Sequence, residues 1–291
     1  MSHIETRGGA GVDCRVAIVI VSFNTRRRLE TCLASLRAAP PASSHQIVVI
    51  DNGSSDGSPD AVETDWPEAR LVRLAENTGF AHAANAGIRR SASELVLLLN
   101  SDAVAPPGSI DRLVAALDAD PSAAVVGPRI VAPDGTVELS FGRMISPWNE
   151  LRQKVLGRAA ASRLPLAGRW AARRTASSRY VDWVSGACLL ARRKDAETVG
   201  LLDERFFLYT EDVDFCAALR ARGRRVLFTP AAEIVHARGS SRQTAPDAAQ
   251  AAYRRSHLAF YAKHHPGWLP LLRAYLRVRG QLPPREASGP P

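Results

Sequence analysis

The stretch that decides the fold is VAIVIVSFN, residues 16–24. Its apolar part, Val16 to Val21, is a continuous and mostly β-branched run, which is typical of a strand buried on both faces. The run ends at once in Ser22, Phe23 and Asn24. Strands of this kind belong to parallel sheets that are covered by helices on both sides.

Strand and helix patterns alternate after this stretch. The expected strands are residues 16–21, 46–50, 71–74 and 95–99, and the expected helices lie around residues 29–36, 80–90 and 110–117. Strands that alternate with helices build βαβ units. The sequence therefore predicts an α/β fold with a Rossmann-like, mostly parallel central sheet flanked by helices.

The second half of the chain is less regular. Segment 145–178 is expected to be helical or partly mobile, and regular structure resumes at residues 180–191. Thr210 is the expected N-cap of a helix that has acids in its first turn and stops at Gly223. Further expected features are extended pieces at 226–228 and 233–236, an amphipathic helix after residue 266 and a disordered Pro-rich end from Pro283.

These patterns suggest a division of the chain into a main domain and two ends. The expected parts are a flexible leader (1–14), a main domain (15–265) with a basic insertion at about 143–179, and a helical tail (266–291).

Composition narrows the class of protein. The chain has 291 residues, 46% of them hydrophobic, which suits one large α/β domain or two modest ones. No apolar run reaches the roughly 18 residues that a membrane span needs, and the leader has no signal-peptide pattern. The four cysteines lack the paired spacing of a zinc site or a disulfide framework. These features predict a cytoplasmic protein.

The positive charge is concentrated in one segment. The formal net charge is +9, and residues 143–179 hold nine basic residues and one acid, Glu150. Such a segment attracts polyanions, which include nucleic acid, an anionic membrane surface and a pyrophosphate-bearing substrate. An ordinary solvated basic face is the alternative.

Polar clusters follow the four expected strands of the first half. They are residues 22–24, 51–53, 77–79 and 100–102. Ligands of open parallel sheets bind at the carboxyl ends of the strands, so these clusters are expected to face one crevice. The chain has neither G-x-G-x-x-G after the first strand nor a P-loop. Carboxylates and amides can instead bind a base and ribose, and they can hold a divalent ion that neutralises a diphosphate.

Six motifs in order resemble the family-2 glycosyltransferases of the GT-A fold, and most of all the bacterial rhamnosyltransferase-type enzymes of cell-wall and surface-polysaccharide assembly. The resemblance covers about residues 15–265, and it implies a nucleotide-binding half (15–105) and an acceptor half (106–265). The motifs are VAIVIVSFN (16–24), IVVIDNGSSDGS (47–58), ENTGFAHAANAGI (76–88), LVLLLNSD (95–102), VSGACLLARR (184–193) and FFLYTEDVDFCAALRARGRRVLFTPAAEIVH (206–236).

The resemblance implies a role for each matching residue. Asp51 would bind the base of the nucleotide, and Asp102 would bind a divalent metal, Mg or Mn, with His236 completing the site. Asn100 stands where many members have a first acid. Asp212 would be the catalytic base, with Glu211 beside it, and Trp183 and Gly186 would line the donor-sugar and acceptor pocket. The implied nucleotide-sugar-binding residues are Ser22, Phe23, Asn24, Asp51, Asn77, Gly79, Asn85, Asn100 and Ser101.

The same resemblance implies an inverting glycosyltransferase. The donor would be a UDP- or dTDP-sugar, with rhamnose as a candidate sugar, and the acceptor a hydroxyl of a lipid-linked or growing glycan at the inner face of the cell membrane. Simpler readings exist for single residues. Glu211 and Asp212 also suit the dipole of a helix N-terminus, and His236 also suits a hydrogen-bonded packing residue.

Two alternative functions predict sequence patterns that differ from the ones found here. A nucleotidyltransferase would carry a glycine- and lysine-rich loop after the first strand, whereas residues 22–28 have no glycine. A nucleic-acid-binding module would interleave aromatic residues with its positive charge. In residues 152–179 the only aromatic residue is Trp170.

A basic amphipathic stripe is expected near the C-terminus, and a helix of this kind can lie in an anionic membrane surface. The alternative is a helix that packs on its own domain or on a second subunit. The apolar stripe consists of Trp268, Leu271, Leu272, Tyr275 and Leu276, with Arg273, Arg277 and Arg279 beside it.

Overall fold

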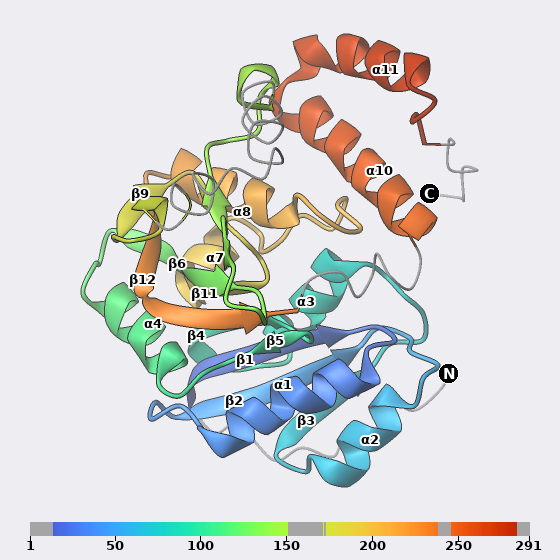
Figure 1. Ribbon diagram of the computed structural model, residues 1–291. Helices are drawn as coiled ribbons and strands as arrows, with labels where there is room; N and C mark the ends of the chain where they lie inside the picture. Colours follow the sequence, from blue (N-terminus) through green and yellow to red (C-terminus); the bar gives the residue numbers. More distant parts are fainter. Residues whose placement is uncertain (1–13, 151–170, 172, 238–245, 284–291) are drawn as a thin grey trace.

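A computed structural model of the chain describes residues 14–150, 171, 173–237 and 246–283 (Figure 1). The strands are β1 (Cys14–Ser22), β2 (His45–Asp51), β3 (Ala69–Arg73), β4 (Ser93–Asn100), β5 (Ala103–Val104), β6 (Ala123–Val131), β7 (Val137–Glu138), β8 (Phe141–Gly142), β9 (Arg179–Val181), β10 (Trp183–Val184), β11 (Cys188–Arg192) and β12 (Arg225–His236). The helices are α1 (Arg26–Ala38), α2 (Ser58–Asp65), α3 (Phe80–Arg89), α4 (Ser109–Asp118), α7 (Arg193–Thr198), α8 (Glu211–Ala221), α10 (Pro246–His264), η1 (Pro266–Trp268) and α11 (Leu269–Val278).

The central sheet has the strand order β3-β2-β1-β4-β11-β6-β12-β5. Strands β3, β2, β1 and β4 are parallel to one another, and β6 is parallel to β12, while β11 runs antiparallel between β4 and β6. The reversed direction of β11 brings the loop before it to the edge at which β1 and β4 end. The α/β fold with a mostly parallel central sheet is confirmed.

Two layers of helices cover the sheet (Figure 1). Helices α1, α2 and α4 pack on one face, where Ile18, Ile20 and Leu97 are wholly buried. Helices α3, α7 and α8 pack on the other face against Val19 and Val48. Because successive side chains of a strand point to opposite faces, the continuous apolar run of β1 fills both layers.

The C-terminal helices α10 and α11 form a third group of helices, which packs beside α8. Phe206, Val213, Phe260 and Tyr261 make a separate buried cluster there. Figure 1 shows α10 beside α8, with α11 folded back across the end of α10. The helix expected after residue 266 is confirmed as α11. Within the described ranges, no helix is long and apolar enough to span a membrane.

Several expectations need correction. The two extended pieces at 226–228 and 233–236 are one strand, β12, whose register shifts between Thr229 and Glu233, around Pro230, which has no N–H for the ladder. Thr210 does not cap α8 with its side chain; its backbone is left-handed, with a φ of 69°. Cys14, which was assigned to the leader, begins β1.

Other expectations fall partly outside the described residues. These are most of the leader (1–13), the middle of the basic insertion (151–170 and 172) and the Pro-rich end (284–291). All four cysteines are buried free thiols.

Candidate functional site

The strand ends lie in register along one edge of the sheet. Ser22 of β1 pairs with Asp51 of β2, and Val21 pairs with Asn100 of β4. The backbone N–H of Asn100 donates to the carbonyl of Ala187, just before β11, at 3.0 Å. The parallel strands and the reversed β11 therefore bring the ends of β1, β2 and β4 and the loop before β11 to the same edge, and three of these four parts carry a predicted polar cluster.

A chain of hydroxyl groups connects the ends of β1 and β4. The Oγ1 atom of Thr25 lies 3.0 Å from Oγ of Ser22 and 3.0 Å from Oγ of Ser101. Ser22 is wholly buried. Such buried hydroxyls need partners, and these three satisfy one another. Ser22 and Ser101, which the resemblance assigns to nucleotide-sugar binding, are thereby brought together.

Asn24 connects the end of β1 with the loop after β2. Its left-handed backbone (φ 53°) lets its N–H donate to Ser54 Oγ at 2.9 Å. Its side-chain oxygen accepts from the N–H of Ser55 at 2.8 Å. Phe23 beside it is 42% exposed, so its ring is open to a ligand at this edge.

Asn52 holds the loop after β2 against the loop before α3. Its amide nitrogen donates to Asn77 Oδ1 at 2.9 Å, and its side-chain oxygen accepts from the N–H of Thr78 at 2.9 Å. Asn77 Oδ1 also accepts from the N–H of Gly79 at 3.1 Å. The cluster at residues 77–79 is thus fixed to the cluster at 51–53.

Asp51 has a buried carboxylate oxygen without a protein partner. The residue is 3% exposed, and its Oδ2 accepts from the N–H of Ser54 at 3.1 Å. Within the described residues its Oδ1 has no hydrogen-bond partner. A buried acceptor of this kind is costly unless a ligand satisfies it. The position suits the base-binding role that the resemblance implies for Asp51.

Asp102 and His236 meet beyond the end of β4. Asp102 Oδ1 lies 3.0 Å from Nε2 of His236, and the amide nitrogen of Asn100 lies 3.3 Å from the same ring atom. The second carboxylate oxygen of Asp102 is 3.6 Å from Nη1 of Arg28. The pairing follows from the backbone, because His236 lies opposite Ala103 and the N–H of Ala237 donates to the carbonyl of Asp102.

This pair suits a divalent ion that is shared with a ligand. A carboxylate oxygen and an imidazole nitrogen 3.0 Å apart can bind one ion together. No group of three or more His, Cys, Asp or Glu side chains forms a metal site in the described part of the chain. Mg²⁺ is commonly held by one or two carboxylates together with substrate phosphates, so the remaining ligands would be diphosphate oxygens and water.

The loop before β11 positions Asp212. The N–H of Gly186 donates to Asp212 Oδ2 at 2.8 Å, and the N–H of Val213 donates to Oδ1 at 2.8 Å. A Cβ atom at residue 186 would lie 3.3 Å from the Cβ of Asp212, so glycine allows this approach. Asp212 is partly exposed at the first turn of α8. Gly186 and Asp212, to which the resemblance gives separate roles, are therefore brought into direct contact.

The two neighbouring carboxyl groups differ in their surroundings. Burial raises the pKa of Glu211 well above its ordinary value, and the nearby Asp212 raises it further. Burial also raises the pKa of Asp212, but the N–H groups of Gly186 and Val213 oppose this by stabilising the anion. Glu211 is thus the group that keeps a proton more readily, which leaves Asp212 as the carboxylate that is more readily ionised and so available to take a proton.

Close packing joins the two halves of the site. A Cβ atom at Gly79 would lie 2.5 Å from the carbonyl oxygen of Phe207, and the N–H of Phe80 donates to that oxygen at 2.7 Å. Gly79 also has a φ of 87°. The turn that leads into α8 therefore rests directly on the N-terminus of α3.

Two expected site residues have structural partners. Asn85 is wholly buried, and its amide nitrogen donates to the carbonyl of Leu202 and to Glu204, both at 2.8 Å. Its oxygen accepts from the N–H of Leu202. Asn85 therefore anchors the loop before α8, and its expected place in the nucleotide pocket is corrected. Trp183 donates from Nε1 to the carbonyl of Arg143 and packs on Gly142.

Sequence patterns alone did not single out three residues of this edge. Thr25, Arg28 and Asn52 connect the predicted residues to one another. Asn52 belongs to the polar cluster at residues 51–53. Its place beside Asp51 is therefore the sequence feature that could have identified it. Thr25 and Arg28 precede or lie within a helix, where polar residues are common.

Two sequence comparisons place the chain among known proteins. A family profile described as "Glycosyl transferase family 2" matches residues 17–174. The N-acetylglucosaminyl-diphospho-decaprenol L-rhamnosyltransferase of Mycobacterium tuberculosis is 35% identical over 290 residues, covering 91% of this chain and 93% of the relative. O-antigen biosynthesis protein RfbC of Myxococcus xanthus is 28% identical over 86% of this chain and 19% of its own length.

Solved structures share the fold. The mannosyltransferase PcManGT from Pyrobaculum calidifontis, in complex with GDP-Man and Mn²⁺, has a TM-score of 0.60 and 20% identity, covering 94% of this chain and 73% of that chain. GalNAc-T7 with UDP, GalNAc and Mn²⁺ has a TM-score of 0.58 and 14% identity, covering 92% and 55%. At these identities, the likeness concerns the fold.

Proposed function

The chain belongs to glycosyl transferase family 2, and from this we propose that it moves a sugar from a UDP- or dTDP-sugar to a hydroxyl of a lipid-linked or polysaccharide acceptor, with inversion at the anomeric carbon. The name of the mycobacterial relative gives L-rhamnose as the sugar and a diphospho-decaprenol-linked acceptor. Its high coverage of both chains supports the same class of donor and acceptor here, with rhamnose as the first sugar to test.

One observation carries the proposal: Asp51, Asp102 and Asp212 lie along the same sheet edge. Asp51 is in register with Ser22, and Asp102 follows Asn100, which neighbours β1. Asp212 is joined to the same edge through Gly186, beside the carbonyl that Asn100 contacts. A nucleotide, its diphosphate and an acceptor hydroxyl need three such groups in one cleft.

The residues divide the reaction into separate tasks. Asp51 would accept a hydrogen bond from the base with its unpartnered Oδ1, and Phe23 would lie against the base or ribose. Asp102 and His236 would hold a divalent ion, which supplies positive charge to the leaving diphosphate. Asp212 would take the proton of the acceptor hydroxyl from the side opposite the leaving group. One displacement of this kind inverts the anomeric carbon without a covalent intermediate.

Nucleotide binding is the first prediction. We expect UDP or dTDP with Mn²⁺ to raise the melting temperature by several degrees, because binding to the folded state alone stabilises it by about 2.7 kcal/mol at a hundredfold excess over Kd. Differential scanning fluorimetry with each nucleotide, with and without Mn²⁺, measures the shift. A screen of UDP-, dTDP- and GDP-sugars for donor hydrolysis then identifies the sugar.

Single-stranded DNA serves as the comparison ligand in the same measurement. A shift with DNA and none with any nucleotide would favour the nucleic-acid-binding alternative and contradict the transferase. A nucleotidyltransferase would instead consume a nucleoside triphosphate, which the hydrolysis screen distinguishes by adding UTP and dTTP.

We further propose that α11 places the enzyme on an anionic membrane surface. Leu269, Leu272 and Leu276 turn toward the protein, and Leu276 is wholly buried. A second apolar stripe faces outward at helical spacing, with Leu271 61% and Val278 88% exposed. The full outward stripe is Trp268, Leu271, Tyr275, Val278 and Leu282.

Further aromatic and basic residues lie beside this outward stripe, and together they form the proposed membrane face. Trp148 is 70% exposed and its ring meets that of Trp268 edge-on at 6.3 Å. Arg273 and Arg277 lie on α11, Arg279 directly follows it, and residues 269–282 contain no acid. Exposed apolar side chains with tryptophan and arginine beside them are typical of helices that lie in the headgroup region of anionic lipid.

Vesicle flotation tests the membrane face. We expect the protein to float with phosphatidylglycerol vesicles at low salt, and less at high salt, because screening weakens the arginine contribution. A variant with Leu271→Ser, Tyr275→Ser and Val278→Ser should stay in the dense fraction. Tyr180→Ser, which removes an exposed aromatic residue on β9, is the matched control. A wild-type protein that stays dense and elutes as a dimer would show that a second copy covers this face instead.

A further inference from the structure

The turn before the carboxyl pair has an unusual backbone. Tyr209 and Thr210 are consecutive non-glycine residues with φ values of 70° and 69°. Left-handed residues of this kind persist only where their surroundings hold them. Glu211 and Asp212 follow directly, so the conformation of this turn sets the direction in which α8 begins.

Helix α10 holds this turn through Ser256. The Ser256 hydroxyl donates to the carbonyl oxygen of Leu208 at 2.8 Å, and the Thr210 hydroxyl donates to the carbonyl of Ser256 at 3.5 Å. Ser256 is 1% exposed, so water does not replace these bonds. The ring of Tyr209 meets that of Tyr253, one turn earlier on α10.

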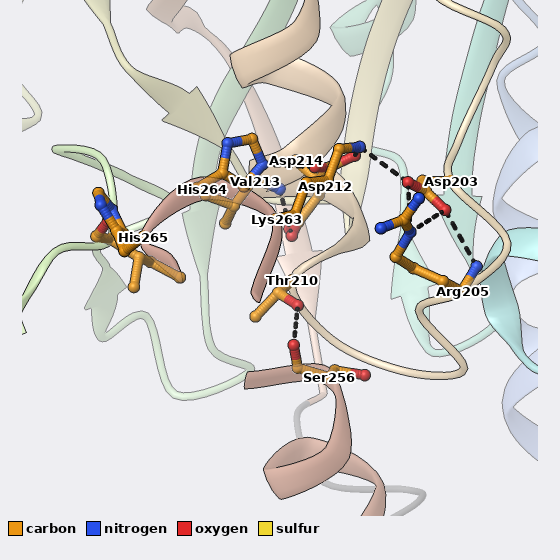
Figure 2. Close-up of polar contacts among 11 residues, drawn as sticks. Asp203, Arg205, Thr210, Asp212, Val213, Asp214, Ser256, Lys263, His264 and His265 are labelled. Atoms are coloured by element: carbon orange, nitrogen blue, oxygen red, sulfur yellow. Dashed lines mark hydrogen bonds and ion pairs between the residues drawn. The ribbon is translucent and has the colours of Figure 1, made fainter. Parts of the chain in front are cut away.

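Helix α10 also holds the first turn of α8 through Asp214. Asp214 is 2% exposed, and its two oxygens accept from Lys263 Nζ at 2.9 Å and His264 Nε2 at 2.6 Å. The N–H of Asp214 donates to the carbonyl of Thr210, which ties it to the left-handed turn. Lys263 makes a second ion pair with Asp203 at 2.7 Å. Figure 2 shows Lys263 between the two aspartates and, earlier on α10, the Thr210–Ser256 contact.

None of the hydrogen bonds described for Asp212 comes from α10. Its carboxylate accepts from the N–H groups of Gly186 and Val213. Helix α10 instead contacts the residues on either side, at Leu208 and Thr210 before the pair and at Asp214 after it. Contacts on both sides fix the position of a residue that must itself stay free to meet a substrate.

We propose that α10 is a positioning element for the proton acceptor, with Ser256, Lys263 and His264 acting through the Leu208 carbonyl and the Asp214 carboxylate. The inference rests on the proposed role of Asp212. A general base must lie within hydrogen-bond reach of the hydroxyl it deprotonates, and a displacement of about 1 Å can lower a rate about a hundredfold. The nucleotide contacts lie on other loops, so these variants leave nucleotide binding in place.

Lys263→Met tests the proposal, with Lys263→Arg and Asp203→Asn beside it. The assay is hydrolysis of the active nucleotide-sugar, in which water replaces the acceptor. We expect Lys263→Met to lower kcat about ten- to a hundredfold with little change in the donor KM, because Asp214 loses a cationic partner. Arginine should restore much of the rate. Asp203→Asn removes the other partner of the same lysine and should leave kcat near the wild-type value.

Calorimetric titration with UDP or dTDP plus Mn²⁺ counts the folded sites in each variant. A normal binding stoichiometry with a reduced kcat supports positioning. A kcat that falls only in proportion to the number of sites, or does not fall, overturns it. If Lys263→Met does not fold, Ser256→Ala is tested in the same way and with the same outcomes. Absence of nucleotide-sugar hydrolysis in the wild type would instead contradict the proposed function.

Discussion

Asp212→Asn is expected to lower kcat for sugar transfer about 10²- to 10⁴-fold, the usual contribution of a general base. Asparagine keeps the size of the side chain, but Gly186 and Val213 donate to different oxygens of Asp212, so the single amide oxygen can accept from only one of them. It cannot take a proton from the acceptor. Nucleotide affinity should stay nearly intact, because Asp212 lies on α8 and the expected nucleotide contacts lie after β1, β2 and β4. Steady-state kinetics and calorimetric titration measure the two quantities.

The pH profile gives an independent check on this variant. Burial raises the pKa of Asp212, and a base works only when it is deprotonated. Wild-type activity should therefore fall as the pH drops through that raised pKa, and the residual activity of Asp212→Asn should lack this dependence. Asp134→Asn, in the turn between β6 and β7, is the control carboxylate and should behave as wild type. Full activity of Asp212→Asn would remove Asp212 as the base.

Asp102→Ala is expected to weaken Mn²⁺-dependent nucleotide binding at least about 10- to 100-fold, which is the loss that even outer-shell partners of a metal cause. The substitution removes the carboxylate that lies 3.0 Å from His236 and 3.6 Å from Arg28. Calorimetric titrations with UDP or dTDP, each with and without Mn²⁺, measure the effect.

The contrast between the two conditions makes this test specific. Binding without Mn²⁺ should change little, because Asp51 and the loops after β1 and β2 remain. Asp118→Ala is the matched control, since it removes an aspartate that pairs with an arginine, Arg15, on the surface. An unchanged response to Mn²⁺ in Asp102→Ala would contradict the metal role of this residue.

The fold and the position of the site follow from local patterns. The apolar run of β1 and the runs of β2 and β4 each predict a buried strand, and a parallel sheet gathers the residues that follow them. This is why Asp51, Asn100 and Asp102 could be placed at one edge from the sequence. The approach of Asp212 came from the family resemblance, since nothing in residues 206–236 shows by itself that α8 meets the Gly186 loop.

Features that depend on tertiary contacts were not predictable. Threonine is a residue type that often caps helices. The backbone of Thr210 is instead left-handed, and its hydroxyl donates to the carbonyl of Ser256 on α10. Asn85 carries an amide that could bind a ligand. Its amide nitrogen instead donates to Leu202 and Glu204. In both cases the partner lies far away in the sequence, and local propensity carries no information about it.

The glycine at residue 79 also limits how this enzyme can be redesigned. Because Gly79 touches the backbone of Phe207, the loop at residues 77–79, to which a nucleotide-sugar-binding role is assigned, and the turn that precedes Asp212 share one contact surface. Any larger residue at 79 would displace both together. Efforts to change the accepted nucleotide-sugar should therefore leave this glycine alone and begin at Phe23 or Ser54, where the sheet edge can be altered without moving the proton acceptor.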